Sequence, residues 1–292
     1  MKSASNISGI LVLTLFPIVV LLSACSELKT DLPSPTSAGV KVHPTGWLSK
    51  TSDDFHGKSI RAQNWEMKPC QVCHGKNYEG GTVGESCTSC HSQPAGPENC
   101  VTCHGSTNAA PPRDLDGKTA KTDRGVGAHQ IHLLGSSLSA DILCSECHVV
   151  PPGVSSSGHL DGTPRAEVVF SNTLTNTRTT GVVPSPTYDP APFKCANTYC
   201  HGNFKNGNSN FVPVWNDASG SQMACGTCHG DVTKATLAER ALPKTSAQGG
   251  THLNVTTCSA CHGDVVDANL RIISPAKHVN GKLSVFGQER DF

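Results

Sequence analysis

The chain has few aromatic side chains, no excess charge of either sign, and no apolar segment long enough to cross a bilayer. Phe, Trp and Tyr make up 5% of its 292 residues, and hydrophobic residues make up 36%. A chain of this length ordinarily buries a large apolar interior, and this composition supplies little material for one. Either much of the chain is irregular, or a group other than side chains fills its interior.

The charges balance. The sequence holds 23 Lys and Arg against 23 Asp and Glu, and it has no basic patch of the kind that binds nucleic acid. We therefore expect no nucleic-acid partner.

The long apolar run lies at the N-terminus, in residues 10–22, and follows a positive charge at Lys2. Its 13 residues fall short of the about 20 that a membrane-spanning helix needs. The run is therefore predicted to be the apolar region of a signal peptide spanning residues 1–24. It ends in "LSAC", which resembles the bacterial lipobox, so Cys25 is predicted to carry the lipid. The alternative is an ordinary signal peptide with Cys25 as a spare thiol.

Cysteine, in contrast, is abundant. Twelve of the fifteen cysteines fall in six CxxCH motifs. This motif attaches c-type haem: its two thiols bond to the haem vinyl groups, and its histidine becomes the proximal ligand of the iron. The motifs are "CQVCH" (70–74), "CTSCH" (87–91), "CVTCH" (100–104), "CSECH" (144–148), "CGTCH" (225–229) and "CSACH" (258–262).

Other uses of paired cysteines fit this pattern less well. Zinc sites do not require a histidine directly after every second cysteine. Disulfide frameworks do not repeat a two-residue spacing with a histidine always following. A redox-active CxxC sits near a βαβ pattern, which this sequence lacks. We therefore interpret all six motifs as haem attachment sites.

A seventh site is predicted at "CANTYCHG" (195–202), whose cysteines are four residues apart. A disulfide or a free thiol pair is the alternative there. The chain has 14 histidines, of which seven directly follow a second cysteine if this site is included. The other seven then supply one distal ligand for each iron, so no histidine and no cysteine after Cys25 is left over.

The predicted ligands can be listed in full. The attachment cysteines are Cys70, Cys73, Cys87, Cys90, Cys100, Cys103, Cys144, Cys147, Cys195, Cys200, Cys225, Cys228, Cys258 and Cys261. The proximal histidines are His74, His91, His104, His148, His201, His229 and His262, and the distal ones are His43, His56, His129, His132, His159, His252 and His278.

One CxxxxCH together with several CxxCH motifs resembles the Geobacter-type multihaem c-type cytochromes. Similar, too, are "PPRDLDG" (111–117), "GVGAHQIHLL" (125–134) and "GHLDG" (158–162), and the resemblance covers about residues 66–287. It implies electron transfer in the periplasm or at the outer membrane, often toward extracellular acceptors. Serine at position 26 favours, by resemblance to Gram-negative lipoproteins, sorting to the outer membrane.

Four segments are predicted: a signal peptide (1–24), a lipid-anchored tether with N-terminal ligands (25–65), a three-haem segment (66–124) and a four-haem segment (125–292). The last contains an internal repeat. Its first copy reads "GAH" (127–129), "CSECH", "HLDG" (159–162) and "VVF" (168–170). Its second copy reads "GTH" (250–252), "CSACH", "HVNG" (278–281) and "SVF" (284–286).

The repeat suggests how the distal histidines pair. His159 and His278 follow equivalent motifs, so we expect them to cap the haems of His148 and His262. His129 and His252 are then each expected to serve a haem upstream of themselves. His132 is left for the haem of His201 or His229, and His43 and His56 for two of the first three haems.

The predicted fold is mostly irregular, with few short helices and a small amount of strand, around a core of stacked haems. Short helices are expected at each CxxCH and over "VTKATLAERA" (232–241). Alternation over residues 166–183 predicts a small hairpin.

The leading functional hypothesis is a low-potential electron carrier, because seven bis-histidine irons would leave no open coordination position for substrate. The expected partners are other cytochromes or a porin-type conduit in the outer membrane, with a metal or mineral as an acceptor. The alternative is a multihaem reductase of the nitrite or sulfite type, in which one haem keeps an open site.

The lipobox gives a direct test. A Cys25→Ser variant is expected to keep its haems but to leave the membrane fraction, because it lacks the residue that carries the lipid. Fractionation of cells followed by haem staining measures this. Retention of the variant in the membrane fraction would contradict the lipoprotein interpretation.

The count of ligands gives a second test. The intact mass of the mature protein is expected to include seven haems, and a Cys195→Ser/Cys200→Ser double variant is expected to carry one fewer. A wild-type mass with six haems, together with alkylation of Cys195 and Cys200, would show that "CANTYCHG" is not an attachment site.

Overall fold

The structure is a computed structural model that describes residues 41–163 and 165–292. The signal peptide, the lipobox and Cys25 lie outside the described residues. The chain divides into two compact units, residues 1–59 and residues 60–292. The finer predicted boundaries at residues 24, 65 and 124 stay predictions.

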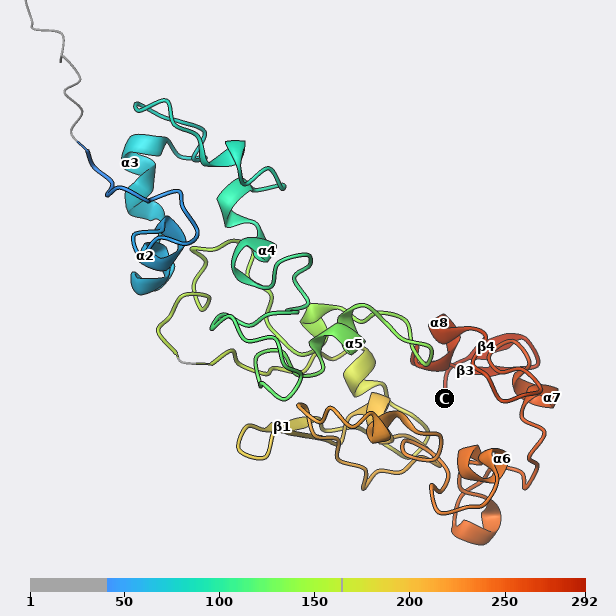
Figure 1. Cartoon of the computed structure of the whole chain (residues 1–292). Helices are drawn as coiled ribbons and strands as arrows, with labels where there is room; N and C mark the ends of the chain where they lie inside the picture. Colours follow the sequence, from blue (N-terminus) through green and yellow to red (C-terminus); the bar gives the residue numbers. More distant parts are fainter. Residues whose placement is uncertain (1–40, 164) are drawn as a thin grey trace, which may run out of the picture. The chain divides into compact units, whose positions relative to one another are not determined.

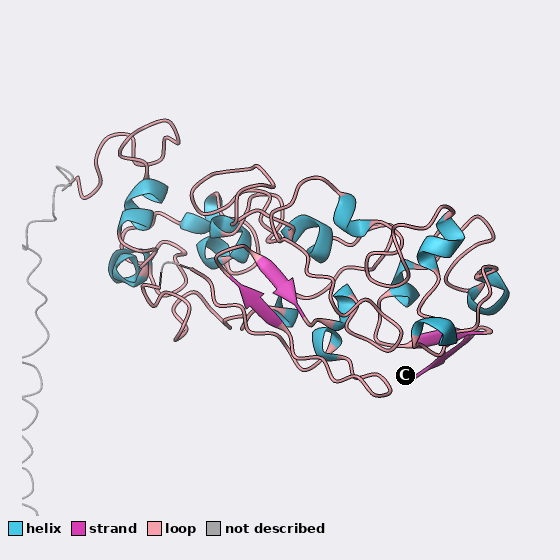
Figure 2. Ribbon diagram, turned by 90° about the horizontal axis from the view of Figure 1, so that it is seen from below, coloured by secondary structure: helices cyan, strands magenta, loops and turns pink. Residues whose placement is uncertain are grey.

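Secondary structure is sparse, and loops connect short elements (Figures 1 and 2). The α-helices are α2 (His56–Ala62), α3 (Gln71–His74), α4 (Cys100–Cys103), α5 (His129–Leu133), α6 (Leu237–Ala241), α7 (Ser259–His262) and α8 (Pro275–His278). The 3-10 helices are η1 (Lys68–Cys70), η2 (Cys87–Ser89), η3 (Gly96–Glu98), η4 (Cys144–Glu146), η5 (Leu174–Asn176), η6 (Tyr199–His201), η7 (Ser221–Met223) and η8 (Ser246–Gln248).

The described strands form two antiparallel pairs. Strand β1 (Thr187–Asp189) pairs with β2 (Lys194–Ala196), with Tyr188 opposite Cys195. Strand β3 (Leu283–Val285) pairs with β4 (Gln288–Arg290), with Ser284 opposite Glu289. The prediction of a mostly irregular chain with short helices and little strand is confirmed.

The expected helical turn is present in five of the six CxxCH motifs, and "CANTYCHG" contains η6. "CGTCH" is the exception, because Gly226 has a φ of +97°, outside the helical region. A Cβ at this position would lie 2.8 Å from the amide nitrogen of Val232 and 2.9 Å from the carbonyl oxygen of Arg240. The chain therefore crosses Gly226 too closely for a side chain, and the motif folds as turns.

Two local predictions need correction. The helix expected over 232–241 is confined to α6, which Thr236 and Glu239 begin with a reciprocal capping box. The hairpin expected over 166–183 is wrong. Its first half is instead bonded to "CSECH", since the amides of Val169 and Ser171 donate to the carbonyls of Cys147 and Glu146.

Side chains form only a small core in the described part of the chain. The buried hydrophobic residues there are Met67, Tyr78, Ala110, Val126, Tyr199, Val265 and Val266. Many large apolar residues are exposed instead, among them Val72 (80%), Leu143 (68%) and Val149 (76%). Side chains alone therefore do not make the interior of this protein.

A search for membrane-crossing segments in the described residues found no helix with the necessary length and apolar character.

Candidate haem sites

Residues 60–292 surround a cavity of about 3160 Å³. Ordinary ligand pockets reach about 1,000 Å³, so this one is several times larger. All ten cysteines and all five histidines of the last five haem motifs line it, and so do His129, His132, His159, His252 and His278. The sequence-predicted ligands of these five motifs are therefore gathered around one space.

Ten histidines in this unit form five facing pairs, each with one predicted proximal and one predicted distal member. The distances between ring centres are 6.0 Å for His104 and His159, 6.4 Å for His148 and His129, 6.0 Å for His201 and His132, 6.3 Å for His229 and His278, and 6.4 Å for His262 and His252. We name each site after its proximal histidine.

This spacing fits a metal ion between the rings. Two imidazoles on opposite sides of one first-row metal, each bonded at about 2.0 Å, have ring centres about 6 Å apart. Rings in direct contact have centres about 4.5 to 7 Å apart, and the stacked pair of His43 and Trp47 lies at 4.4 Å. The spacing of the five pairs therefore has room for a metal ion between two axial ligands.

Hydrogen bonds fix which ring nitrogen each pair presents. The Nδ1 atom of His148 lies 2.7 Å from the carbonyl oxygen of Glu167, and Nδ1 of His278 lies 2.7 Å from that of Leu138. A ring nitrogen that donates to a carbonyl leaves the other nitrogen, Nε2, with its lone pair for a metal. The same Nδ1-to-carbonyl contact is made by His56, His74, His129, His132, His159, His229, His252 and His262.

Burial lowers the pKa of several of these paired histidines. Desolvation lowers the pKa of His129, His201 and His229 to about 4, well below the ordinary value for histidine. The pKa values of His104 and His132 are also lowered, again chiefly by desolvation. At neutral pH these five imidazoles are therefore in the unprotonated form that binds a metal.

The cysteines are in a similarly apolar setting. Desolvation raises the pKa of Cys147 to about 12, of Cys195 to about 11 and of Cys200 to about 12. All fourteen described cysteines, including Cys195 and Cys200, are free of disulfides. A thioether to haem carries no charge and suits this environment.

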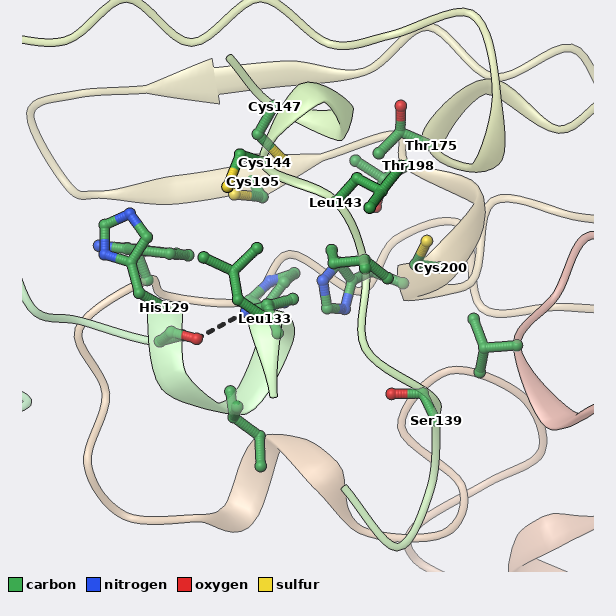
Figure 3. Close-up of a pocket in the computed structure, with 18 of the residues that line it drawn as sticks. His129, Leu133, Ser139, Leu143, Cys144, Cys147, Thr175, Cys195, Thr198 and Cys200 are labelled. Atoms are coloured by element: carbon green, nitrogen blue, oxygen red, sulfur yellow. Dashed lines mark hydrogen bonds between the residues drawn. The ribbon is translucent and has the colours of Figure 1, made fainter. Parts of the chain in front are cut away.

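The two extra residues of "CANTYCHG" allow the chain to turn between its cysteines. Cys195 belongs to strand β2, and Cys200 belongs to η6. Asn197 lies between them with a φ of +58°, a left-handed conformation that asparagine tolerates. Figure 3 shows the thiols of Cys144, Cys147 and Cys195 close together, with Cys200 on the other side of Thr198. Two neighbouring motifs therefore present their cysteines to the same part of the cavity.

Two of the expected pairings are wrong. His159 faces His104 rather than His148, and His278 faces His229 rather than His262. The reason is that the position opposite His148 is already taken by His129, which the short helix α5 carries there. In both copies of the repeat, the segment that follows the CxxCH therefore places its histidine opposite the haem motif that precedes this CxxCH.

The complementary expectation, that His129 and His252 serve upstream motifs, is wrong for the same reason. Each faces the next motif along the chain, His148 or His262. The equivalence of the two copies nevertheless holds. In both, the histidine of "GAH" or "GTH" faces the following CxxCH, and the histidine of "HLDG" or "HVNG" faces the preceding one.

The remaining distal residues stand as follows. His132 faces His201, one of the two partners expected for it. His43 and His56 lie in the first unit, where both contact Trp47, and their assignment to two of the first three haems stays a prediction.

Sequence reasoning missed the groups that orient the proximal rings. In the first copy, His148 is bonded to the carbonyl of Glu167, and two residues later Val169 donates to Cys147. In the second copy, His262 is bonded to Ser284, and two residues later Phe286 donates to Cys261. The repeated "VVF" and "SVF" were a partial signal: both bonds of the second copy come from "SVF", whereas in the first copy Glu167 directly precedes "VVF" and only Val169 lies within it.

A comparison with protein families found one match. Residues 194–229 match the family described as "Geobacter CxxxxCH...CXXCH motif", which spans strand β2, "CANTYCHG" and "CGTCH". Neither the curated proteins nor the solved structures contain a match to the chain. The motifs and the sparse fold define a multihaem c-type cytochrome, a class that serves electron transfer. Residues 194–229 are similar to the Geobacter CxxxxCH type.

The facing pairs give a test of ligand assignment. A His159→Ala variant removes the ring opposite His104, so the haem attached at "CVTCH" is expected to become high-spin. Electron paramagnetic resonance (EPR) of the oxidised protein measures this signal. Its origin is checked in two backgrounds, one lacking Cys100 and Cys103 and one lacking Cys144 and Cys147. The new signal should be absent only from the first; absence only from the second would restore the pairing of His159 with His148.

Proposed function

We propose that this cytochrome is a low-potential electron conduit with seven covalently attached c-type haems, each held by two histidines. The observation that carries the proposal is the set of five facing histidine pairs inside one cavity. The haem iron supplies one-electron exchange. In these five sites the two facing histidines would hold each iron, which would leave no coordination position for a substrate.

Ligand type supports a low potential. A methionine opposite a histidine raises the reduction potential of a haem, whereas the ring facing each proximal histidine in these five sites is another histidine. Apolar residues beside the motifs support the attachment of a large apolar group. Leu143 and Val149 flank "CSECH", line the cavity and are largely exposed, so porphyrin edges are expected to cover them.

The proposed location is the outer membrane, with a lipid on Cys25 as anchor and the haems on the periplasmic or the cell-surface side. Support comes from the lipobox and from Ser26. The proposed partners are other cytochromes or a porin-type conduit, with a metal or mineral as the extracellular acceptor.

Net charge favours cationic partners over anionic substrates. Removal of residues 1–24 removes one lysine and no acid, which leaves 22 basic and 23 acidic residues and a net charge of −1. Each bis-histidine haem adds about −1 when ferric and −2 when ferrous, so seven give totals of about −8 oxidised and −15 reduced. Such a field repels nitrite and attracts metal cations or a basic patch on a cytochrome.

The competing function is a reductase in which one haem keeps an open site for nitrite or sulfite. Stopped-flow oxidation of the fully reduced protein separates the two. We expect chelated ferric iron or a partner cytochrome to oxidise all seven haems quickly and nitrite to act slowly, because no iron offers nitrite a ligand position. The His159→Ala variant is the matched control, since it opens one position. Fast multi-electron turnover of the wild type with nitrite or sulfite would contradict the conduit.

A further inference from the structure

Trp215 contacts the distal histidines of two different sites. Its ring centre lies 4.6 Å from that of His129, with the planes at 86°, and 5.7 Å from that of His132, with the planes at 21°. These histidines are three residues apart on α5, and they face His148 and His201 respectively. One indole is therefore packed against a ligand of each of two neighbouring haem sites.

The indole itself is held firmly. Its Nε1–H donates to the carbonyl of Arg124 at 2.8 Å, and the amide of Trp215 donates to the carbonyl of Phe193 at 2.6 Å. Gly127 lies against the ring with a φ of +44°, and a Cβ there would be 2.1 Å from Nε1. The glycine of "GAH" is thus required for the indole to reach the helix that carries both histidines.

The two sites also meet at their attachment cysteines. Figure 3 shows the sulfurs of Cys147 and Cys195 close together, with His129 nearby. The His148 and His201 sites are therefore adjacent on both their cysteine side and their distal side.

We propose that Trp215 is a positioning residue that sets the ring planes of His129 and His132 and thereby couples the His148 and His201 haems. The proposal rests on the proposed function, since it requires haem at both sites. An indole packed against both ligand rings adds to their Nδ1 hydrogen bonds in restricting the rotation of each ring, so one residue would tune two irons.

The first unit repeats this arrangement with different residues. Trp47 stacks on His43 with ring centres 4.4 Å apart, and its ring centre lies 6.1 Å from that of His56. The Nδ1 atom of His56 is also 2.9 Å from the carbonyl oxygen of Trp47. Two of the three tryptophans in the chain thus each contact two predicted distal ligands.

Ring planes are observable in the oxidised protein. When two axial imidazole planes are nearly perpendicular, their interactions with the iron d orbitals are equivalent, and the low-spin EPR signal becomes strongly anisotropic. The planes of His132 and His201 are at 74°, whereas those of His129 and His148 are at 25°. The His201 haem should therefore give a strongly anisotropic signal and the His148 haem an ordinary one.

The test compares Trp215→Ala, Trp215→Phe and the control Trp65→Ala in the full-length holoprotein. Trp65 lines the same cavity and has no ring contact with a histidine among the described residues. His129→Met and His132→Met variants identify the two haems, because a thioether ligand raises the potential of its own haem. Potentiometric titration and EPR are the readouts, and intact mass counts the haems.

We expect Trp215→Ala to lower the potentials of both haems, because water replaces the indole, and to reduce the anisotropy of the His201 signal, because His132 can rotate. Trp215→Phe should shift the potentials of the same two haems by less. If the alanine variant loses a haem, the phenylalanine variant provides the test of the proposal. The proposal would be overturned if Trp215→Ala shifted the potential of neither haem or of only one. It would also be overturned if Trp65→Ala shifted the potentials equally. Failure of the conduit itself would appear separately, as fewer than seven haems in the wild-type mass.

Discussion

The separation of about 6 Å between facing imidazole rings is the constraint on which the rest of this structure depends. To hold two rings at that distance, the chain must bring together segments that are often far apart in sequence, and it must prevent each ring from turning. It meets the second requirement with backbone carbonyls that accept from Nδ1. Regular secondary structure contributes little, because short turns are enough to aim a histidine.

The interleaved pairing has a consequence for how the haem sites are connected. Within each copy of the repeat, the loop after one CxxCH supplies the histidine that faces the motif before it. The histidine that precedes this CxxCH faces the histidine of the CxxCH itself. Two successive sites are therefore bound together by the chain that runs between them. An electron-transfer protein gains from this design, because neighbouring sites cannot separate without breaking ligand contacts.

Contacts between the two copies extend this principle. The Nδ1 atom of His278, in the second copy, is bonded to the carbonyl of Leu138 in the first, and the amide of Ala140 donates to the carbonyl of Pro275. The His229 site thus depends on a loop that follows α5, almost a hundred residues earlier in the chain. Trp215 makes a comparable long-range link, since its indole is bonded to the carbonyl of Arg124.

The sequence by itself determined the class of the protein, its attachment motifs and the irregular nature of its fold. These follow from local chemistry: a CxxCH motif places two thiols and an imidazole within one turn, and few aromatic residues cannot form a large core. The count of histidines in the sequence also led to the prediction of a further site at Cys195 and Cys200. The partner of each distal histidine could not be predicted from the sequence, and the expected pairings of His159 and His278 were wrong. A ligand's partner depends on which loops pack together, and neither the repeat nor the spacing encodes that directly. The tertiary structure alone decided which motif each ring faces, and that Trp215 contacts the rings of both His129 and His132.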